Sequence, residues 1–271
     1  MKREMIGFIG AGNMANALVK GLINSGLYGP SQLSASDKEQ EKIQKITRQF
    51  GLHGCASNQE LVRECPIIVL AVKPQSMEEV LKDICGEIRD HHLLISIAAG
   101  IPLNRIQAII ERKIPLIRVM PNTPALVQKG ISALAANQEA TEEHLHLAKM
   151  IFDAVGETLI VEEGMIDAVT ALSGSGPGFI FKILECFIKA GEEMGFEREI
   201  SNRLILQTVL GAAHLAKESE KSLSELREMV TSPGGTTEAG LSVFEQKGLE
   251  ELIGEAVTAA WKRGIELGKQ S

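Results

Sequence analysis

The segment Met5-Ile-Gly-Phe-Ile-Gly-Ala-Gly-Asn-Met-Ala-Asn-Ala-Leu-Val-Lys-Gly-Leu22 predicts the fold of the N-terminal half of the chain. A short apolar strand runs directly into Gly10-x-Gly12-x-x-Ala15, and a helix follows. In this motif the first glycine permits a tight turn, the second lets the backbone approach a pyrophosphate, and a small third residue lets helix and strand pack closely. The motif alone is a weak signal, but its place between a strand and a helix predicts a dinucleotide site.

Strand-like and helix-like patterns alternate over about the first 160 residues of the chain. The expected strands lie at 5–9, 32–36, 53–56, 66–72, 93–97, 116–120, 131–135 and 158–161. Such alternation predicts a mainly parallel sheet with crossover helices on its faces. The expected fold class is therefore α/β, with a doubly wound, Rossmann-type N-terminal domain over 1–162.

The pattern changes after residue 163, where long helical segments replace the alternation. Glycine and proline break these segments at Gly176-Pro177, Gly195 and Pro233-Gly-Gly235, and no strong strand is found among them. The segments 179–194 and 201–217 are apolar over much of their surface, and such helices need burial on more than one side. We therefore expect an all-helical C-terminal domain over 163–271 that dimerises.

The composition bounds the partners and the location of the protein. Of its 271 residues 44% are hydrophobic and 23% are charged, and the formal net charge of −7 comes with no basic patch, which argues against a nucleic-acid partner. The chain enters its first strand without an apolar signal-peptide region. Its most apolar runs, 67–72 and 93–99, are too short to span a bilayer. We expect a cytoplasmic protein with no membrane partner.

The cysteines and histidines indicate no metal centre. The four cysteines form no C-x-x-C pair and show no ligand spacing with any of the six histidines. We expect reduced thiols that mostly serve packing, and an enzyme without a metal.

A second glycine-rich segment lies near the C-terminal end, in Ser232-Pro-Gly-Gly-Thr-Thr237. The proline and the two glycines fix a rigid loop, and the two threonines bring hydroxyl and N–H groups to the expected start of a helix. A helix N-terminus of this kind can hold a carboxylate. An ordinary helix cap would explain Ser-Pro-Gly-Gly alone equally well.

The chain resembles the pyrroline-5-carboxylate reductase family in a set of sequence blocks that occur in the family's order. These blocks are Gly7-Phe-Ile-Gly-Ala-Gly-Asn-Met14, Ala71-Val-Lys-Pro74, Ile97-Ala-Ala-Gly100, Met120-Pro-Asn-Thr-Pro-Ala125, Leu172-Ser-Gly-Ser-Gly-Pro177 and the 232–237 loop. Each block is unspecific by itself, whereas the set from end to end is highly specific.

The resemblance implies a set of cofactor contacts around the carboxyl ends of the strands. They are Gly10, Gly12, Asn13, Met14, Ser36, Asn58, Ala71, Val72, Lys73, Pro74 and Ala99. The tip of the second strand, Ser36-Asp37-Lys38, is mixed, because NAD sites usually place an acid there and NADP sites offer hydroxyl and basic groups. Ser36 aligns with the family's phosphate-side serine, which favours NADPH, while Asp37 keeps NADH use open.

The resemblance also implies the reaction, a hydride transfer from NAD(P)H to 1-pyrroline-5-carboxylate that gives L-proline, the last step of proline biosynthesis. It assigns Gly235, Thr236 and Thr237 to substrate binding, with the Thr237 hydroxyl as the hydrogen-bond partner of the ring nitrogen. Glu220 aligns with a substrate-side glutamate that favours the protonated nitrogen. A solvated helix end explains Glu220 equally well, because it lies in Lys217-Glu-Ser-Glu-Lys221.

Two other interpretations remain. A β-hydroxyacid dehydrogenase shares this domain plan, and Gly174-Ser-Gly-Pro-Gly-Phe-Ile-Phe-Lys182 resembles its approach to a catalytic lysine. That family needs an amide four residues after the lysine, where this chain has Cys186. The other interpretation is a non-catalytic NADP-binding regulatory paralogue, and the retention of Thr237, Gly234, Gly235 and the full glycine turn argues against it.

The resemblance implies an assembly as well. Family members intertwine their C-terminal helices as dimers, and some assemble further into rings. Their active site lies between the nucleotide domain of one subunit and the helical domain of its partner. We therefore expect a homodimer with ring assembly as a further option.

Overall fold

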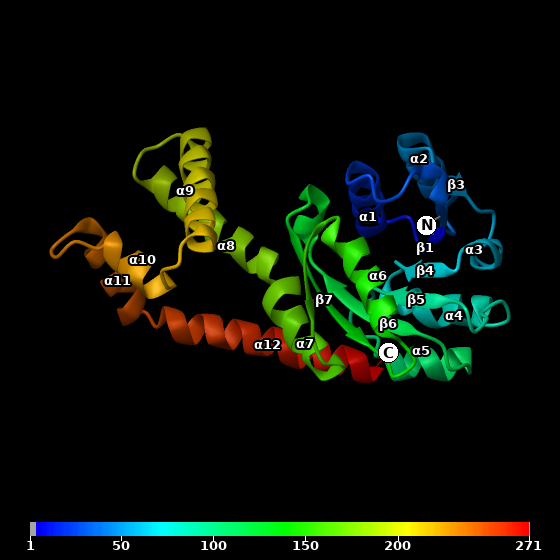
Figure 1. Cartoon of the computed structure of the whole chain (residues 1–271). Coiled ribbons are helices and arrows are strands. Elements are labelled where there is room, and N and C mark those ends of the chain that lie inside the picture. The colour runs from blue at the N-terminus through cyan, green and yellow to red at the C-terminus, as the bar shows by residue number, and fades with distance from the viewer. Residues whose placement is uncertain (1–3, 271) are drawn as a thin grey trace. The chain divides into compact units, whose positions relative to one another are not determined.

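A computed structural model of the chain describes residues 4–270 and contains one eight-stranded sheet (Figure 1). The strand order is β3-β2-β1-β4-β5-β6-β7-β8, and every neighbouring pair is parallel except β6 and β7. The strands are β1 Ile6–Ile9, β2 Leu33–Ser36, β3 His53–Gly54, β4 Ile67–Leu70, β5 Leu93–Ser96, β6 Leu116–Pro121, β7 Gly130–Ala136 and β8 Gly156–Ile160. This is the α/β, mainly parallel fold predicted from the sequence.

Helices cover both faces of the sheet, because alternate residues of each central strand point to opposite sides. In β4, Ile67 and Val69 join the apolar cluster beneath α1 (Asn13–Asn24), α2 (Gln40–Phe50) and α6 (Glu142–Asp153). Ile68 and Leu70 join the cluster beneath α3 (Asn58–Glu64), α4 (Met77–Ile84) and α5 (Leu103–Ile110). The continuous apolar run of β4 is thus buried on both sides, as expected for a central parallel strand.

The antiparallel pair β6–β7 follows from a short connection. Between the two strands the chain forms only the 3₁₀ turn η3 (Thr123–Val127). A parallel neighbour would need a crossover of a dozen residues or more, whereas an antiparallel neighbour needs only a turn. The shorter 3₁₀ turns are η1 Pro30–Gln32, η2 Pro74–Ser76 and η4 Glu163–Met165.

The C-terminal part is helical throughout its described length, as predicted. Its elements are α7 Ile166–Val169, the π-turn η5 Thr170–Gly174, α8 Gly176–Glu193, α9 Arg198–Glu218, α10 Leu223–Met229, α11 Thr236–Gln246 and α12 Leu249–Gln270. Two compact units emerge: Gly176–Ala259 forms one, and the residues before it, together with those from Ala260 onward, form the other. The functional division into 1–162 and 163–271 stays a prediction.

The helical unit leaves much of its apolar surface uncovered. Within it α8 and α9 pack against each other, yet Leu184 is the one large apolar side chain among its described residues that is buried. The exposed large apolar side chains on these two helices are Ile180, Phe181, Ile183, Phe187, Ile200, Leu204, Leu206, Leu210 and Leu215. A patch of this size is uncommon on a soluble monomer.

One described stretch, Glu163–Glu193, is long and apolar enough to cross a membrane by length and composition alone. It exceeds the apolar runs considered from the sequence because several helical elements join end to end. Only 11% of its most apolar window is buried. Length and composition are weak evidence of a membrane span, because helices buried in a subunit interface pass the same test.

A buried ion-pair network ties the end of the sheet domain to the segment that follows β8. The Arg118 side chain on β6 is 4% exposed, and its Nη2 donates to Asp167 Oδ1 at 2.8 Å. Glu163 lies 3.6 Å from Arg118 Nη1 and also accepts the N–H of Leu103 at 2.6 Å. The Arg118 Nε has no hydrogen-bond partner among the described residues. The carboxylates of Asp167 and Glu163 therefore compensate the buried positive charge of the guanidinium.

Replacing Asp167 by Asn should lower the free energy of unfolding by about 2–3 kcal/mol, because it removes an ionic partner from a buried guanidinium. Glu87→Gln is a matched control. The Glu87 carboxylate has the same 2.8 Å contact with an arginine, but that arginine, Arg63, is 61% exposed. Its replacement should cost less than about 1 kcal/mol. Chemical unfolding at one protein concentration measures both, and equal losses would contradict the network's importance.

Candidate functional site

The turn after β1 brings the carboxyl ends of three strands together at the point where the strand order reverses. Gly10 has a φ of +102°, and its N–H donates to the carbonyl oxygen of Ser36 at 2.7 Å. A Cβ on this residue would lie 2.6 Å from the carbonyl oxygen of Ala71. Both the dihedral angle and the close approach therefore require glycine. Ligands of open α/β sheets bind at such a switch point.

Gly12 differs from Gly10, because nothing around it requires glycine in the protein alone. It is the N-cap residue of α1 with an extended backbone, and an added Cβ would meet no atom within 4 Å. No side chain caps the helix start. Asn13 is exposed there, and Met14 packs partly against the core. The space beside Gly12 and the uncapped N–H groups fit the approach of a pyrophosphate.

A cavity of about 490 Å³ opens in front of this turn. Of the predicted cofactor contacts it is lined by Gly10, Gly12, Asn58, Ala71, Val72 and Lys73. Pro74 and Ala99 instead line a second hollow of about 330 Å³. Asn13, Met14 and Ser36 line neither of these two hollows.

Asp37, which directly follows β2, lines the cavity, whereas Ser36, the last residue of the strand, does not. Ser36 is 2% exposed, and its hydroxyl donates to Asn58 Oδ1 at 2.8 Å. The Asn58 amide in turn donates to Asp83 Oδ2 at 2.9 Å. Asp37 accepts the N–H of Ala11 within the glycine turn at 2.8 Å and lines the cavity. The role of Ser36 in binding a phosphate stays a prediction.

Two lysines also line the cavity: Lys38, from the mixed tip Ser36-Asp37-Lys38, and Lys42, which was not identified from the sequence. Lys42 lies 2.6 Å from Glu39, and this hydrogen bond raises the pKa of the lysine. The position of Lys42 in the first turn of α2, next to the tip of β2, was the signal that would have found it.

The 232–237 loop forms the N-terminal cap of helix α11. Gly234 has a φ of +71°, and its N–H donates to Glu238 Oε2 at 2.6 Å. The N–H of Gly235 donates to the carbonyl oxygen of Ser232 at 2.9 Å. Helix α11 then begins at Thr236, so the N–H groups of Thr236 and Thr237 have no acceptor within the helix. The first bond of the helix runs from the N–H of Ala239 to Gly235, so the donors left free within the helix start are those of Thr236, Thr237 and Glu238.

The predicted substrate residues Gly235, Thr237 and Glu220 differ in exposure and position. Gly235 lines a hollow of about 690 Å³ between α10 and α11. Thr237 is half-buried, and Glu220 is exposed in the short connection between α9 and α10. Neither of these two lines that hollow. Their roles in substrate binding stay predictions.

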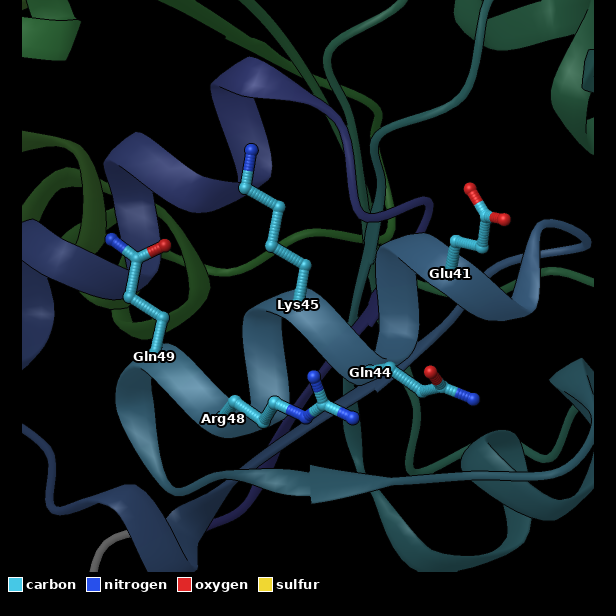
Figure 2. Close-up of a pocket in the computed structure, with 5 residues that line it drawn as sticks. All are labelled: Glu41, Gln44, Lys45, Arg48 and Gln49. Carbon is cyan, nitrogen blue, oxygen red and sulfur yellow. The ribbon is translucent and has the colours of Figure 1, made fainter.

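A further hollow of about 450 Å³ lies over α2, but it brings no set of reactive side chains together. It is lined by Glu41, Gln44, Lys45, Arg48 and Gln49, and Figure 2 shows that these side chains project from one helix without converging on a point. All the lining residues belong to a solvated helix face.

Comparisons with known proteins cover both parts of the chain. A family model described as pyrroline-5-carboxylate reductase dimerisation matches residues 163–267, and one described as NADP oxidoreductase, coenzyme F420-dependent, matches residues 5–100. Among curated relatives, the pyrroline-5-carboxylate reductase of Pseudomonas aeruginosa is 43% identical over 271 residues, covering 100% of this chain and 99% of that protein.

Solved structures agree over the same length. A pyrroline-5-carboxylate reductase from Coxiella burnetii has a TM-score of 0.90 at 40% identity, covering 97% of this chain and 98% of the other. The pyrroline carboxylate reductase of Plasmodium falciparum, solved with NADP bound, has a TM-score of 0.89 at 31% identity and covers 99% of each chain. With matches of this identity along its whole length, the chain belongs to the pyrroline-5-carboxylate reductase family.

Proposed function

We propose that the protein reduces 1-pyrroline-5-carboxylate to L-proline with NADPH, the last step of proline biosynthesis. The observation that carries the proposal is full-length identity to reductases of that name, spanning both the glycine turn and the 232–237 loop. A β-hydroxyacid dehydrogenase would leave that loop without a role. A regulatory paralogue would have no need to keep both the open space at Gly12 and the uncapped threonine N–H groups.

The cavity at the switch point fits a nicotinamide dinucleotide. Gly12 and the first turn of α1 offer open space and uncapped N–H groups to the pyrophosphate, and the carboxyl ends of β1 and β4 form the floor. When bound, the reduced nicotinamide supplies the hydride. Lys38 and Lys42 give the cavity wall two cations suited to the 2′-phosphate of NADPH, whereas the Asp37 carboxylate suits a ribose hydroxyl. NADPH is therefore the preferred cofactor, and NADH can also serve.

The 232–237 loop supplies the substrate site in this proposal. The N–H groups of Thr236 and Thr237, beside Gly235, hold the substrate carboxylate at the start of α11. The Thr237 hydroxyl donates to or accepts from the ring nitrogen, and Glu220 favours its protonated form. The protonated ring nitrogen makes the adjacent carbon a better hydride acceptor. The chain then acts by orientation and electrostatics rather than by a strong general acid.

The active unit we propose is a cytoplasmic homodimer, with ring assembly as a further option. The exposed apolar faces of α8 and α9 lie in the part of the chain that matches the dimerisation model. A second copy would bury them by two-fold symmetry. In the assembly the 1–162 domain of one subunit would meet the 163–271 domain of its partner.

Thr237→Ala should lower turnover with pyrroline-5-carboxylate and NADPH at least tenfold, because one oriented hydrogen bond in a desolvated site is worth about 2–3 kcal/mol. Thr237→Ser should restore most of the rate. Thr231→Ala is the control, since that hydroxyl donates to the carbonyl oxygen of Arg227 in the last turn of α10. Steady-state kinetics decide the matter. Full turnover in the alanine variant would show that Thr237 serves only as a helix cap. No activity in the parent protein would reject the reductase and leave the dehydrogenase and the regulatory paralogue as the two explanations.

Gly12→Val should abolish NADPH binding without a change in melting temperature, because the new side chain fills space that only a ligand would use. Gly86→Val is the control, as Gly86 also has no atom within 4 Å of an added Cβ but lies in the turn after α4. Fluorescence titration with NADPH measures the affinity. Unchanged affinity in the Gly12 variant would place the pyrophosphate elsewhere.

Mixing the two defective subunits tests the shared site. After dissociation and reassociation, Gly12→Val and Thr237→Ala chains should recover about a quarter of the parent activity, since half of the dimers are mixed and each has one intact site of two. Either variant alone, treated in the same way, gives the baseline. A mixture that stays at the baseline would refute a site built from two subunits, and a fully active monomer in light scattering would refute the dimer.

A further inference from the structure

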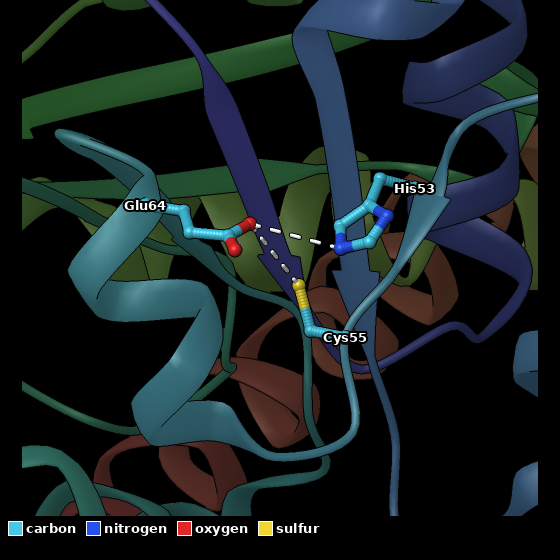
Figure 3. Close-up of side chains that lie close together, drawn as sticks. All are labelled: His53, Cys55 and Glu64. Atoms are coloured by element: carbon cyan, nitrogen blue, oxygen red, sulfur yellow. Dashed lines mark hydrogen bonds and ion pairs between the residues drawn. The ribbon is translucent and has the colours of Figure 1, made fainter.

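Three side chains of different chemistry meet at the edge of the sheet, away from the glycine turn. His53 and Cys55 come from β3 and the residue just after it, and Glu64 is the last residue of α3. Figure 3 shows the carboxylate directed at both the imidazole and the thiol. Within residues 4–270 these three form a group whose possible ligand atoms all lie within 4.8 Å of one another. We call them the β3 cluster.

The possible ligand atoms of the β3 cluster lie slightly farther apart than the ligand atoms of a tetrahedral zinc site. His53 Nε2 lies 3.7 Å from Glu64 Oε2, and Cys55 Sγ lies 4.0 Å from the same oxygen. Around Zn²⁺, with bonds of about 2.0–2.3 Å, tetrahedral ligand atoms lie roughly 3.4–3.6 Å apart. Small rotations of the exposed His53 and Glu64 side chains would close this difference. Cys55, which is buried, already has a fixed position.

A second observation comes from the layer beneath the cluster. Ser34 on β2 is paired in register with His53, and its hydroxyl is fully buried. That hydroxyl neighbours the thiols of Cys55 and Cys65, yet it has no hydrogen-bond partner among the described residues. A buried hydroxyl without a partner is costly, and it would be satisfied as a donor to a thiolate.

The charges around Cys55 suit a cation better than they suit a free thiolate. Cys55 is buried, and Glu64 places a carboxylate oxygen 4.0 Å from its sulfur. Glu60, whose carboxylate accepts the N–H of Ala56 at 2.6 Å, adds a second negative charge nearby. These two carboxylates would stabilise a divalent cation bound to the sulfur, and that ion would displace the thiol proton.

We propose that His53, Cys55 and Glu64 form a binding site for a thiophilic divalent cation, with Zn²⁺ as the physiological ion and water as the fourth ligand. Imidazole, thiolate and carboxylate are all zinc ligands, and three protein ligands leave one position open. The ion would join the two-residue edge strand β3 to the end of α3. The sequence spacing does not show this site, because Glu64 reaches it only through the fold of α3.

Titration of metal-free protein with Co²⁺ tests the site through a spectrum rather than through activity. One ion per chain should bind, with a near-ultraviolet sulfur-to-metal charge-transfer band and the strong visible bands of tetrahedral cobalt. Zn²⁺ should remove these bands by displacement and raise the melting temperature. Because no cofactor or substrate is present, the result is independent of the proposed reductase activity.

Variants separate the β3 cluster from other thiols. Cys55→Ser should abolish the charge-transfer band, and His53→Gln and Glu64→Gln should each weaken Co²⁺ binding at least about tenfold. The two latter residues are partly exposed, so their replacement should leave the melting temperature of the metal-free protein unchanged. Cys186→Ser is the control, because Cys186 is the exposed free thiol and lies on α8. It should keep the full band. A band that survives Cys55→Ser, or no stoichiometric binding by the parent protein, would overturn the proposal.

Discussion

The close approach of β1 to β4 is the constraint on which the N-terminal domain depends. The turn at Gly10 passes so near the carbonyl oxygen of Ala71 that no side chain fits between them. In the same turn the N–H of Gly10 donates to the carbonyl oxygen of Ser36, the last residue of β2. Three strand ends are thereby held at one point, and α1 leaves that point with its N–H groups uncapped. The position of the cavity and the open space beside Gly12 both follow from this crowded turn.

Most of the fold could be predicted from local patterns, and most of the rest depends on contacts between distant residues. All eight strands overlap the segments predicted for them, and the central strands β1, β4 and β5 leave the strongest local signal because they are apolar and fully buried. The reversal at β7 depends on the length of one connection rather than on any pattern within the strand. The site divides in the same way. Gly10 and Gly12 have roles that their motif states, whereas the burial of Ser36 and the bond from Ala11 to Asp37 are set by tertiary packing.

The helical unit shows the opposite balance between local pattern and packing. Its helices are well specified by sequence, with a capping box at Ser222 and Glu225 and a glycine at the start of α11. Its apolar side chains nevertheless find few partners within the unit. Local propensity thus determines the elements, and burial of their faces requires a surface that this chain alone does not supply. Sequence reasoning reached this conclusion because an all-round apolar helix is visible in the residues themselves.

The sheet domain needs the last residues of α12 to complete its packing, and these residues are synthesised last. Gly100, with a φ of +73°, follows β5, and the backbone of Leu267 and Gly268 lies about 3.5 Å from where its Cβ would be. These late residues belong to the same compact unit as the sheet. During synthesis the sheet domain would therefore emerge from the ribosome early and yet wait for the entire helical unit before its last contacts form. A nascent chain released before residue 268 would lack the end of α12 that packs beside Gly100 after β5, even if its sheet had folded.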